Sequence, residues 1–479
     1  MLLRASRSSP RRTSLLLGGT AFLLYAVTLT HGVGWDDSAE LAAGVERLGI
    51  VHQTGYPAYL LLGHMFGAVE PFGSDAMRVN LWSAVCAGLT VGLSARYVLT
   101  VGAGARGASV TALLVAVEPL FWYHATTASV YPFFLLVLAL LLNAADAWLR
   151  RPGPLRLALF AATIGLTLIA HKLGIAFAVG ALTLVALRAR GRQLVGLTAI
   201  ALPMAMIIYI PLRHGYPGFP NLIGDATTWE WVSGTAGGAP DTEPFAAATA
   251  HDARVHSERL IVLLLASLSP AAVLLVPLGI RQLWSRQAYM FCSLVPSVVA
   301  TIIVLTTPAA PAYFHLPLLV SGAIACGAGV RSLKRPALGA LCGLAMLVPV
   351  GVGVSYIAES DRDAGAWSRE TLRGLPRGAR VFAPWTAYAP LRAVQELESV
   401  REDVRVEIAP PDSRPEDTVK RAGVDGFSVA LSADPLDVPG AIPVGPAARA
   451  NLKGLSGLDA GPFAIGSQEV TARTYRLAK

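Results

Sequence analysis

Charged side chains are scarce in this chain. Only 15% of its 479 residues are Asp, Glu, Lys or Arg, whereas 54% are hydrophobic. A soluble globular protein carries roughly 25% charged residues. The scarcity therefore excludes a chain built of two or three soluble domains and indicates a polytopic membrane protein.

Cysteine is also rare, and its placement argues against two kinds of site. The four cysteines lie within apolar runs, and no two of them have the spacing of metal ligands. We interpret them as small buried hydrophobic residues rather than as disulfide partners or zinc ligands. They are Cys86, Cys292, Cys326 and Cys342.

Apolar segments long enough to cross a bilayer, about 17–25 residues each, are abundant and predict eleven membrane spans. They lie at residues 14–30, 79–101, 107–123, 131–149, 155–170, 173–188, 194–212, 259–280, 288–306, 311–330 and 337–357. No small-x-small cleavage site follows the first segment, so we expect an uncleaved helix there. The fifth and sixth segments predict either a tight hairpin or a broken helix. The shorter segment 59–69 predicts a half-buried helix near the interface.

Basic residues are distributed unevenly between alternate connections. The connections on the side of the N-terminus contain basic clusters, such as 150–151 and 188–192, whereas the opposite connections contain few. By the positive-inside rule the N-terminus lies in the cytoplasm, and an odd number of spans places the C-terminal part outside the cell membrane. The positive-inside distribution of basic residues then accounts for most of the net charge of +8, and no nucleic-acid partner is expected.

The chain is predicted to have two parts. Residues 1–358 form a mostly α polytopic transmembrane bundle with long outer loops at 31–78 and 213–258. Residues 359–479 lack long apolar runs and contain neither a phosphate-binding glycine loop nor a nucleophile elbow. Alternating strands and helices predict a small accessory α/β domain there. The strands are expected at 380–382, 404–408 and 427–431, and the helices at 389–400 and 416–421.

The first outer loop carries three carboxylates, Asp36, Asp37 and Glu40, beside the membrane boundary. Acidic side chains next to a bilayer are costly unless they face water, a partner or a substrate. One interpretation is that Asp37 caps a helix starting near Ser38 and that Glu40 completes a pattern like a capping box. The other is a general base at the membrane surface, whose pKa desolvation raises toward neutrality.

Other candidate residues lie at outer helix ends and turns. His52 is a second base, a phosphate partner or a structural histidine, and Tyr56 stacks on a sugar or packs in the turn. The basic residues His171, Lys172 and Arg213 either bind a lipid phosphate or snorkel to the interface.

Two further pairs carry the same ambiguity. Asn221 and Asp225, in the second outer loop, stabilise loop turns or bind substrate. Tyr313 and His315 line a cavity or belong to an aromatic belt at the membrane interface.

Several of these stretches follow one another as in a known family. Asp37-Ser38-Ala39-Glu40 resembles the pattern D-S-G-E, and residues 48–57 are similar to L-G-I-x-H-P-P-G-Y-P, with Gln53-Thr54 in place of the two prolines. The other matching stretches are Arg78-Val79-Asn80-Leu81, Ser129-Val130-Tyr131, Gly165-Leu166 with His171, Pro211-Leu212-Arg213 with Asn221 and Gly224-Asp225, Tyr313 with Pro317, and residues 375–379, 390–391, 395 and 401–406. The ordered set resembles a family of polytopic membrane proteins described as domain of unknown function 2723. That family includes an animal endoplasmic-reticulum protein O-mannosyltransferase and belongs with the glycosyltransferase C superfamily.

The resemblance implies an inverting glycosyltransferase. Such an enzyme moves a mannose-like sugar from a polyprenyl-phosphate donor in the bilayer to a hydroxyl of a protein or glycan acceptor, at the outer face. It implies that Asp37 is the general base, that Asp36 or Glu40 positions the acceptor or tunes Asp37, and that basic residues hold the leaving phosphate. The substrate-binding candidates are His52, Tyr56, Tyr131, His171, Lys172, Arg213, Asn221 and Asp225. No cofactor and no metal site are predicted, although a carboxylate cluster can bind a divalent metal.

Two other functions are compatible with the sequence. A transporter or lipid flippase requires charged residues within the spans, and Glu118 and Asp146 are the candidates, both near segment ends. No inverted repeat is visible. A non-catalytic scaffold requires that residues 359–479 bind a partner on their own.

Overall fold

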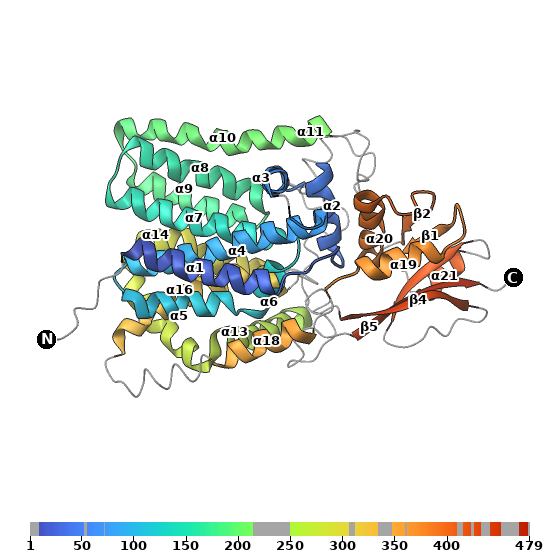
Figure 1. Cartoon of the computed structure of the whole chain (residues 1–479). Coiled ribbons are helices and arrows are strands. Elements are labelled where there is room, and N and C mark those ends of the chain that lie inside the picture. Colours follow the sequence, from blue (N-terminus) through green and yellow to red (C-terminus); the bar gives the residue numbers. More distant parts are fainter. Residues whose placement is uncertain are drawn as a thin grey trace.

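The computed structural model consists of a helical bundle and a smaller α/β region near the C-terminus (Figure 1). It describes residues 9–51, 55–70, 72–213, 250–305, 312–333, 347–359, 362–409, 415–422, 426–432, 441–451 and 469–477. Most bundle helices run lengthwise, and the α/β region sits at one end of them (Figure 1).

The lengthwise helices make up most of the described bundle. They are α1 (Pro10–Val27), α4 (Asp75–Thr100), α5 (Gly104–Ala116), α7 (Val130–Arg150), α8 (Pro154–Ala170), α9 (Gly174–Arg188), α13 (Ala250–Leu283), α15 (Val295–Leu305), α16 (Leu316–Gly329) and α18 (Leu347–Glu359). The other helical elements are α2 (Asp37–Arg47), α3 (Pro57–Val69), α6 (Pro119–Ala125), η1 (Gly191–Ile200), α10 (Ala201–Met204), η2 (Ala205–Ile208), α11 (Tyr209–Arg213), α14 (Gln287–Tyr289), η3 (Met290–Leu294), η4 (Ala312–His315) and η5 (Val330–Ser332).

Several of these helices are long and apolar enough to cross a membrane. In the described chain five stretches qualify by themselves, and α5 with α6 adds a sixth that is bent by 70°. The five are Asp75–Thr100, Val130–Arg150, Gly191–Arg213, Gln287–Leu305 and Tyr313–Ser332. Shorter apolar helices, including α3, α8 and α9, complete the bundle. The chain is a multi-pass membrane protein.

Most described residues of the eleven predicted segments are helical, and six of these segments, the bent one included, are long and apolar enough to cross a membrane. Two of the eleven need correction. The span expected at 107–123 is broken, because Pro119 begins α6 and the Glu118 carboxylate accepts the N–H of Phe121 as its cap. The span expected at 259–280 is broken at Ser269, where φ is +61°. Ser269 precedes a proline, which disfavours the helical conformation.

Three other expectations concern helix pairs and ends. Segments 155–170 and 173–188 are separate packed helices, α8 and α9, as the hairpin interpretation requires. The short helix expected from residue 59 is α3. The segment 337–357 lies partly outside the described residues, and α18 covers its second half.

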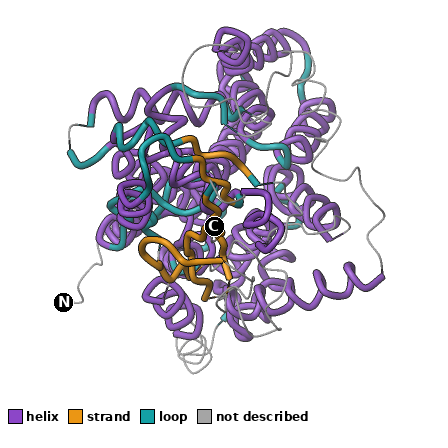
Figure 2. The backbone as a smooth tube through the Cα atoms, turned by 90° about the vertical axis from the view of Figure 1, so that its right-hand side faces the viewer, coloured by secondary structure: helices purple, strands orange, loops and turns teal. Residues whose placement is uncertain are grey.

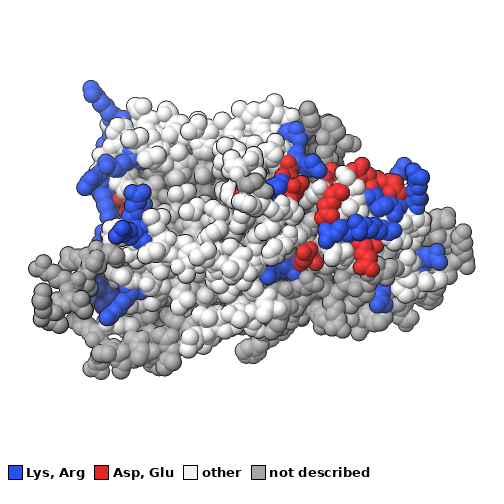
Figure 3. Space-filling model, viewed as in Figure 1, with Lys and Arg blue, Asp and Glu red and all other residues white. Residues whose placement is uncertain are grey.

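Large apolar side chains are exposed on the outer surface of the bundle. Leucines on several helices point outward, as Leu16, Leu202 and Leu274 do with 71%, 76% and 75% of their surface exposed. Figure 3 shows Lys and Arg gathered at the end away from the α/β region, and charges of both signs at the other end. Between the two ends lies a white belt over the bundle, as expected of a surface that faces lipid.

The α/β region contains a five-stranded mixed sheet with the order β2-β1-β3-β5-β4. The described strands are β1 (Arg380–Ala383), β2 (Arg405–Ile408), β3 (Phe427–Ser432), β4 (Ala441–Asn451) and β5 (Glu469–Leu477). Strands β2 and β3 pair parallel to β1, and β5 pairs antiparallel to β3 and β4. Its helices are α19 (Gly365–Gly374), α20 (Trp385–Glu398) and α21 (Pro415–Ala422).

The parallel part of this sheet follows the sequence pattern. The three expected strands and both expected helices are confirmed as β1, α20, β2, α21 and β3. In these β-α-β units α20 packs on β1 and β2, and α21 packs on β1 and β3. The elements α19, β4 and β5 were not predicted. Figure 2, viewed toward the α/β region, shows the strands in front of the ends of the bundle helices.

Glycines allow α1 and α4 to pack closely. A Cβ atom at Gly18 would lie 2.8 Å from the carbonyl oxygen of Gly88 and 3.1 Å from the Cα of Gly92. Small residues commonly bring membrane helices into such contact, because packing rather than the hydrophobic effect drives their association. A Cβ atom at the adjacent Gly19 would meet no neighbouring part of the described structure within 4 Å.

The neighbouring glycines give a matched test of this packing. We expect Gly18→Leu to destabilise the bundle by about 1–3 kcal/mol through overpacking, whereas Gly19→Leu leaves it unchanged. The measurement is the thermal unfolding midpoint of each purified variant in one detergent. Equal midpoints for the two variants would contradict the close contact.

Candidate functional site

The helix α2 begins at the carboxylates Asp36 and Asp37 in the connection between α1 and α4. Asp36 occupies its N-cap position without a side-chain capping hydrogen bond, and Asp37 is the first helical residue. The interpretation of Asp37 as the cap of a helix starting near Ser38 is therefore wrong. Because the helix begins earlier, Glu40 falls beyond the third helical position, which a capping box requires.

Asp36 has an unusual backbone conformation, with φ +55° and ψ −141°. This region is sparsely populated by residues other than glycine. Such conformations persist only where the surrounding structure holds them, and they are concentrated at functional sites. The N–H of Asp36 donates a hydrogen bond to the carbonyl of Thr386 in α20 at 3.4 Å. The turn that presents Asp37 is thus held by the α/β region.

Asp37 lies between the α/β region and an aromatic cluster of the bundle. On one side the Nε1–H of Trp385 donates a hydrogen bond to Asp37 Oδ1 at 2.8 Å. On the other side Asp37 is close enough to interact electrostatically with His124, Tyr131 and Tyr313. Half-buried Asp37 therefore faces a site built from both parts of the protein.

The aromatic cluster combines residues from four separate segments. The rings of Tyr56 and His171 are stacked, with centroids 6.1 Å apart and planes at 10°. Tyr131 lies 5.4 Å from His171 and 4.6 Å from Tyr313, again between ring centroids. Phe314 completes the group at 5.6 Å from His171. The structure thus brings together Tyr56, Tyr131 and His171, three residues predicted from the sequence.

The basic pair between α8 and α9 reaches the same cluster. His171 is buried, and its Nδ1 accepts the N–H of Leu173 at 3.2 Å, which leaves the Nε2 position for the proton of a neutral ring. Lys172 is exposed, with Nζ 5.5 Å from the ring centroid of Phe314. Partial desolvation lowers the pKa of this ammonium. Two adjacent polar groups therefore border one face of the cluster.

Two other predicted residues, Glu40 in α2 and Arg213 at the end of α11, have partners away from Asp37. Glu40 is fully buried and close enough to Tyr388 of α20 for electrostatic interaction. Arg213 donates hydrogen bonds from its guanidinium to the carbonyls of Leu48, at 2.8 Å, and Arg47, at 3.0 Å. A cation at the C-terminal end of a helix satisfies its last carbonyls and its dipole. In this structure Arg213 thus anchors the end of α2 opposite to Asp37.

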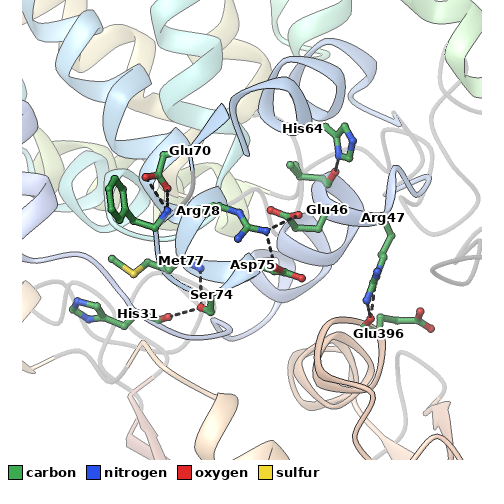
Figure 4. A network of polar contacts seen from close by, with 12 residues as sticks. His31, Glu46, Arg47, His64, Glu70, Ser74, Asp75, Met77, Arg78 and Glu396 are labelled. Carbon is green, nitrogen blue, oxygen red and sulfur yellow. Dashed lines mark hydrogen bonds and ion pairs between the residues drawn. The ribbon is translucent and has the colours of Figure 1, made fainter. Parts of the chain in front are cut away.

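A polar network joins α2 to neighbouring elements (Figure 4). Arg78 binds Glu46 at 3.3 Å and Asp75 at 2.6 Å, which ties α4 to α2. Arg47 donates to the backbone carbonyl of Glu396 in α20. The helix that carries Asp37 is therefore attached to the bundle and to the α/β region.

Three of the predicted site residues, His52, Asn221 and Asp225, lie outside the described residues. Within the described part of the chain, no group of three His, Cys, Asp or Glu side chains is arranged to hold a metal ion.

Several residues around Asp37 were not predicted as site residues from the sequence. His124 in α6 forms a hydrogen bond with the Ser129 hydroxyl at 3.0 Å and packs against Tyr131. Trp385 is 348 positions from Asp37 in the chain, so no local pattern links the two. Tyr313 was considered either as a cavity residue or as part of an aromatic belt, and the structure places it in the cluster.

Sequence comparison finds similarity to protein O-mannosyltransferases. Residues 37–194, less than half of the chain, match the family model described as "Protein O-mannosyl-transferase TMEM260 N-terminal domain". The mouse (Mus musculus) protein "Protein O-mannosyl-transferase TMEM260" is 28% identical over 125 residues, which are 26% of this chain and 18% of the mouse protein. The match thus spans less than a fifth of that relative.

Structural comparison extends the likeness over most of the chain. ArnT from Cupriavidus metallidurans bound to undecaprenyl phosphate superposes with a TM-score of 0.54 at 12% identity, over 86% of this chain and 92% of ArnT. Its apo state gives a TM-score of 0.53 at 11% identity over the same shares. The protein therefore has the fold of ArnT, and its N-terminal part is similar to that of the protein O-mannosyltransferase TMEM260.

Proposed function

We propose that the protein is an integral-membrane glycosyltransferase. It moves a mannose-like sugar from a polyprenyl-phosphate donor to an acceptor hydroxyl, preferably on a protein, at the outer face of the membrane. The observation that carries the proposal is the position of Asp37, a carboxylate between an aromatic cluster at one end of a membrane bundle and the α/β region above it.

The proposed reaction is an inverting displacement. Asp37 accepts the proton of the acceptor hydroxyl, whose oxygen attacks the anomeric carbon of the donor sugar. The new glycosidic bond forms as the bond from that carbon to the phosphate oxygen breaks, and the polyprenyl phosphate leaves. A positioned general base contributes about 10²- to 10⁴-fold to such a rate. Asp36 or Glu40 positions the acceptor or tunes Asp37.

The leaving phosphate is assigned to the basic groups near the cluster. His171 and Lys172 are adjacent and border the side of the cluster formed by Phe314. Charge-assisted hydrogen bonds to phosphate are stronger than neutral ones. Arg213 remains a candidate for the same role, together with its observed anchoring of α2. Tyr56 and Tyr131 supply the aromatic surface that a sugar ring packs against.

The comparisons support the donor and acceptor classes. The ArnT structure that shares this fold was solved with undecaprenyl phosphate. The mouse relative is named for protein O-mannosyl transfer. A donor with a lipid tail between the helices explains why this chemistry is placed in a membrane bundle. No cofactor beyond the lipid-linked donor is proposed.

The transporter alternative gains no observation in its favour. Glu118 accepts hydrogen bonds from the Ser267 hydroxyl, at 2.8 Å, and from the N–H of Phe121, so it serves as a helix cap. Asp146 pairs with Arg150 at 2.6 Å near the end of α7. Both carboxylates predicted as transport residues therefore have structural partners.

We propose the orientation with the N-terminus in the cytoplasm and the α/β region outside. It is supported by the gathering of Lys and Arg at the end of the bundle away from the α/β region (Figure 3).

Replacing the proposed base tests the function directly. We expect Asp37→Asn to lower sugar transfer by about 10²-fold or more. The assay follows labelled mannose from a polyprenyl-phosphate donor in membranes containing the purified protein. Glu70→Gln is the control, because Glu70 is a carboxylate of the same loop whose oxygens, within the described structure, accept the local N–H of Phe72. Full activity of the Asp37 variant would remove Asp37 from the mechanism.

Lys172 generates a pH prediction. Its lowered pKa means that the ammonium loses its proton, and its attraction for phosphate, at a lower pH than a free lysine does. We expect the donor KM to rise as the pH climbs through that lowered pKa. Lys172→Arg, which stays charged, should keep the donor KM level over the same range.

The neutral variant completes this series. We expect Lys172→Gln to raise the donor KM about tenfold at pH values below the pKa of Lys172, because it removes a charge-assisted hydrogen bond, and to remove the pH dependence of KM that the lysine causes. A donor KM that is unchanged in Lys172→Gln would exclude the lysine from phosphate binding.

The orientation is testable by labelling from outside the cell. Cys86, Cys292 and Cys326 are buried, and the fourth cysteine, Cys342, is replaced by serine in the background protein, so a new surface cysteine is distinguishable. A membrane-impermeant maleimide should label Glu402→Cys, in the α/β region, and not Arg106→Cys, at the opposite end of the bundle. The reverse pattern would show that the α/β region faces the cytoplasm.

A further inference from the structure

The α/β region contributes directly to the turn that presents Asp37. Two consecutive residues at the start of α20 bind two consecutive residues at the start of α2. The indole Nε1–H of Trp385 donates to Asp37 Oδ1 at 2.8 Å, and the carbonyl of Thr386 accepts the N–H of Asp36 at 3.4 Å. We propose that Trp385 is a positioning residue of the transferase site, which fixes the Asp37 carboxylate for proton transfer and is supplied by the outer region. This inference rests on the proposed function.

Fixing one oxygen of a carboxylate sets the direction of the other. A general base must lie within hydrogen-bond reach of the proton it accepts and at the right angle. With Oδ1 held by the indole, rotation of the Asp37 carboxylate relative to the aromatic cluster is restricted. Misplacement of a catalytic group by about 1 Å can cost 10²-fold in rate. The indole therefore acts on the rate through the geometry of Asp37.

The same hydrogen bond favours the ionised form of Asp37. A donor to a carboxylate stabilises the charged state, whereas a neighbouring negative charge opposes it. Titratable groups that interact electrostatically with this carboxylate include His124 of α6, Tyr131 of α7 and Tyr313 of η4, and Asp36 is its neighbour in the chain. Removing the indole donor should make Asp37 easier to protonate. On acidification, Asp37 should then stop acting as a base at a higher pH than in the unmodified protein.

The position of Trp385 is itself tightly determined. Its ring stacks on Tyr388 of the same helix, with centroids 5.9 Å apart and planes at 28°. Before Asp37 in the chain, the carbonyl of Val33 accepts the N–H of Ala364 at 2.8 Å. After Asp37, the guanidinium of Arg47 donates to the carbonyl of Glu396. Contacts between the bundle and the α/β region thus lie on both sides of Asp37 in the chain, and they hold α20, which carries the Trp385 indole, against the bundle.

A second tryptophan of the α/β region provides a matched control. Trp367 packs on Trp35 of the same loop, with ring centroids 5.2 Å apart. Its buried Nε1–H has no hydrogen-bond partner in the described structure. Trp385 and Trp367 therefore both hold this loop against the α/β region, but only the Trp385 indole donates to Asp37. If Trp385 acted by packing alone, phenylalanine would replace both equally well.

The experiment compares Trp385→Phe, Trp367→Phe and Asp37→Asn in the full-length protein. Initial rates of sugar transfer are measured against pH at saturating and limiting acceptor. We expect Trp385→Phe to lower kcat about 10- to 100-fold. We also expect it to move the acid limb, which is the pH range in which kcat/KM falls on acidification, to higher pH. Trp367→Phe should keep the acid limb of the unmodified protein.

The outcomes separate this inference from the proposed function. If Asp37→Asn is inactive and both phenylalanine variants keep the same acid limb, the positioning role is overturned and the base role stands. If Asp37→Asn keeps full activity, the base role fails and the positioning role fails with it. A shifted acid limb in Trp385→Phe alone supports both.

A spectroscopic measurement tests the hydrogen bond without the tryptophan variants, so its result does not depend on whether those variants fold. The chain has nine tryptophans, so 15N labelling of tryptophan gives few indole signals. One indole N–H signal should move as Asp37 titrates and should shift in Asp37→Asn. The absence of any indole signal with both properties would overturn the hydrogen bond on which the inference rests.

Discussion

The structure depends on holding the Asp37 carboxylate where the end of the helical bundle meets the α/β region. Burial in an apolar medium disfavours a carboxylate unless hydrogen bonds or opposite charges compensate. Asp37 meets this constraint with the indole N–H of Trp385 on one side and an aromatic, partly polar cluster on the other. The strained backbone at Asp36 and the anchored end of α2 follow from the same need, since both fix where this one side chain lies.

The two parts of the protein are consequently interdependent. The bundle supplies α2, the Tyr131–Tyr313 contact and the basic pair after α8, whereas the α/β region supplies the start of α20. An α/β region that contacts the turn of Asp36 and Asp37 is more than a partner-binding appendage, which weakens the scaffold hypothesis. A site at this junction also suits the proposed chemistry, because a lipid-linked donor arrives from the membrane side and a polar acceptor from the aqueous side.

Local patterns in the sequence predicted the helices, the parallel strands and part of the site. Hydropathy identified the membrane helices because lipid demands long apolar runs. It failed at Pro119 and at Ser269, where a helix is broken without a loss of hydrophobicity. Tyr56, Tyr131 and His171 were found through ordered motifs. The bond from Trp385 to Asp37 and the positive φ of Asp36 could not be found, because both arise from tertiary docking between distant segments.

The central claim is that this chain transfers a sugar to hydroxyl groups outside the membrane. It is tested most directly by mass spectrometry of the glycoproteins and glycolipids of cells that carry the intact chain and of cells that lack it. The account predicts serine or threonine peptides bearing a hexose only in cells with the chain. Identical glycopeptide and glycolipid profiles in the two kinds of cell would contradict it.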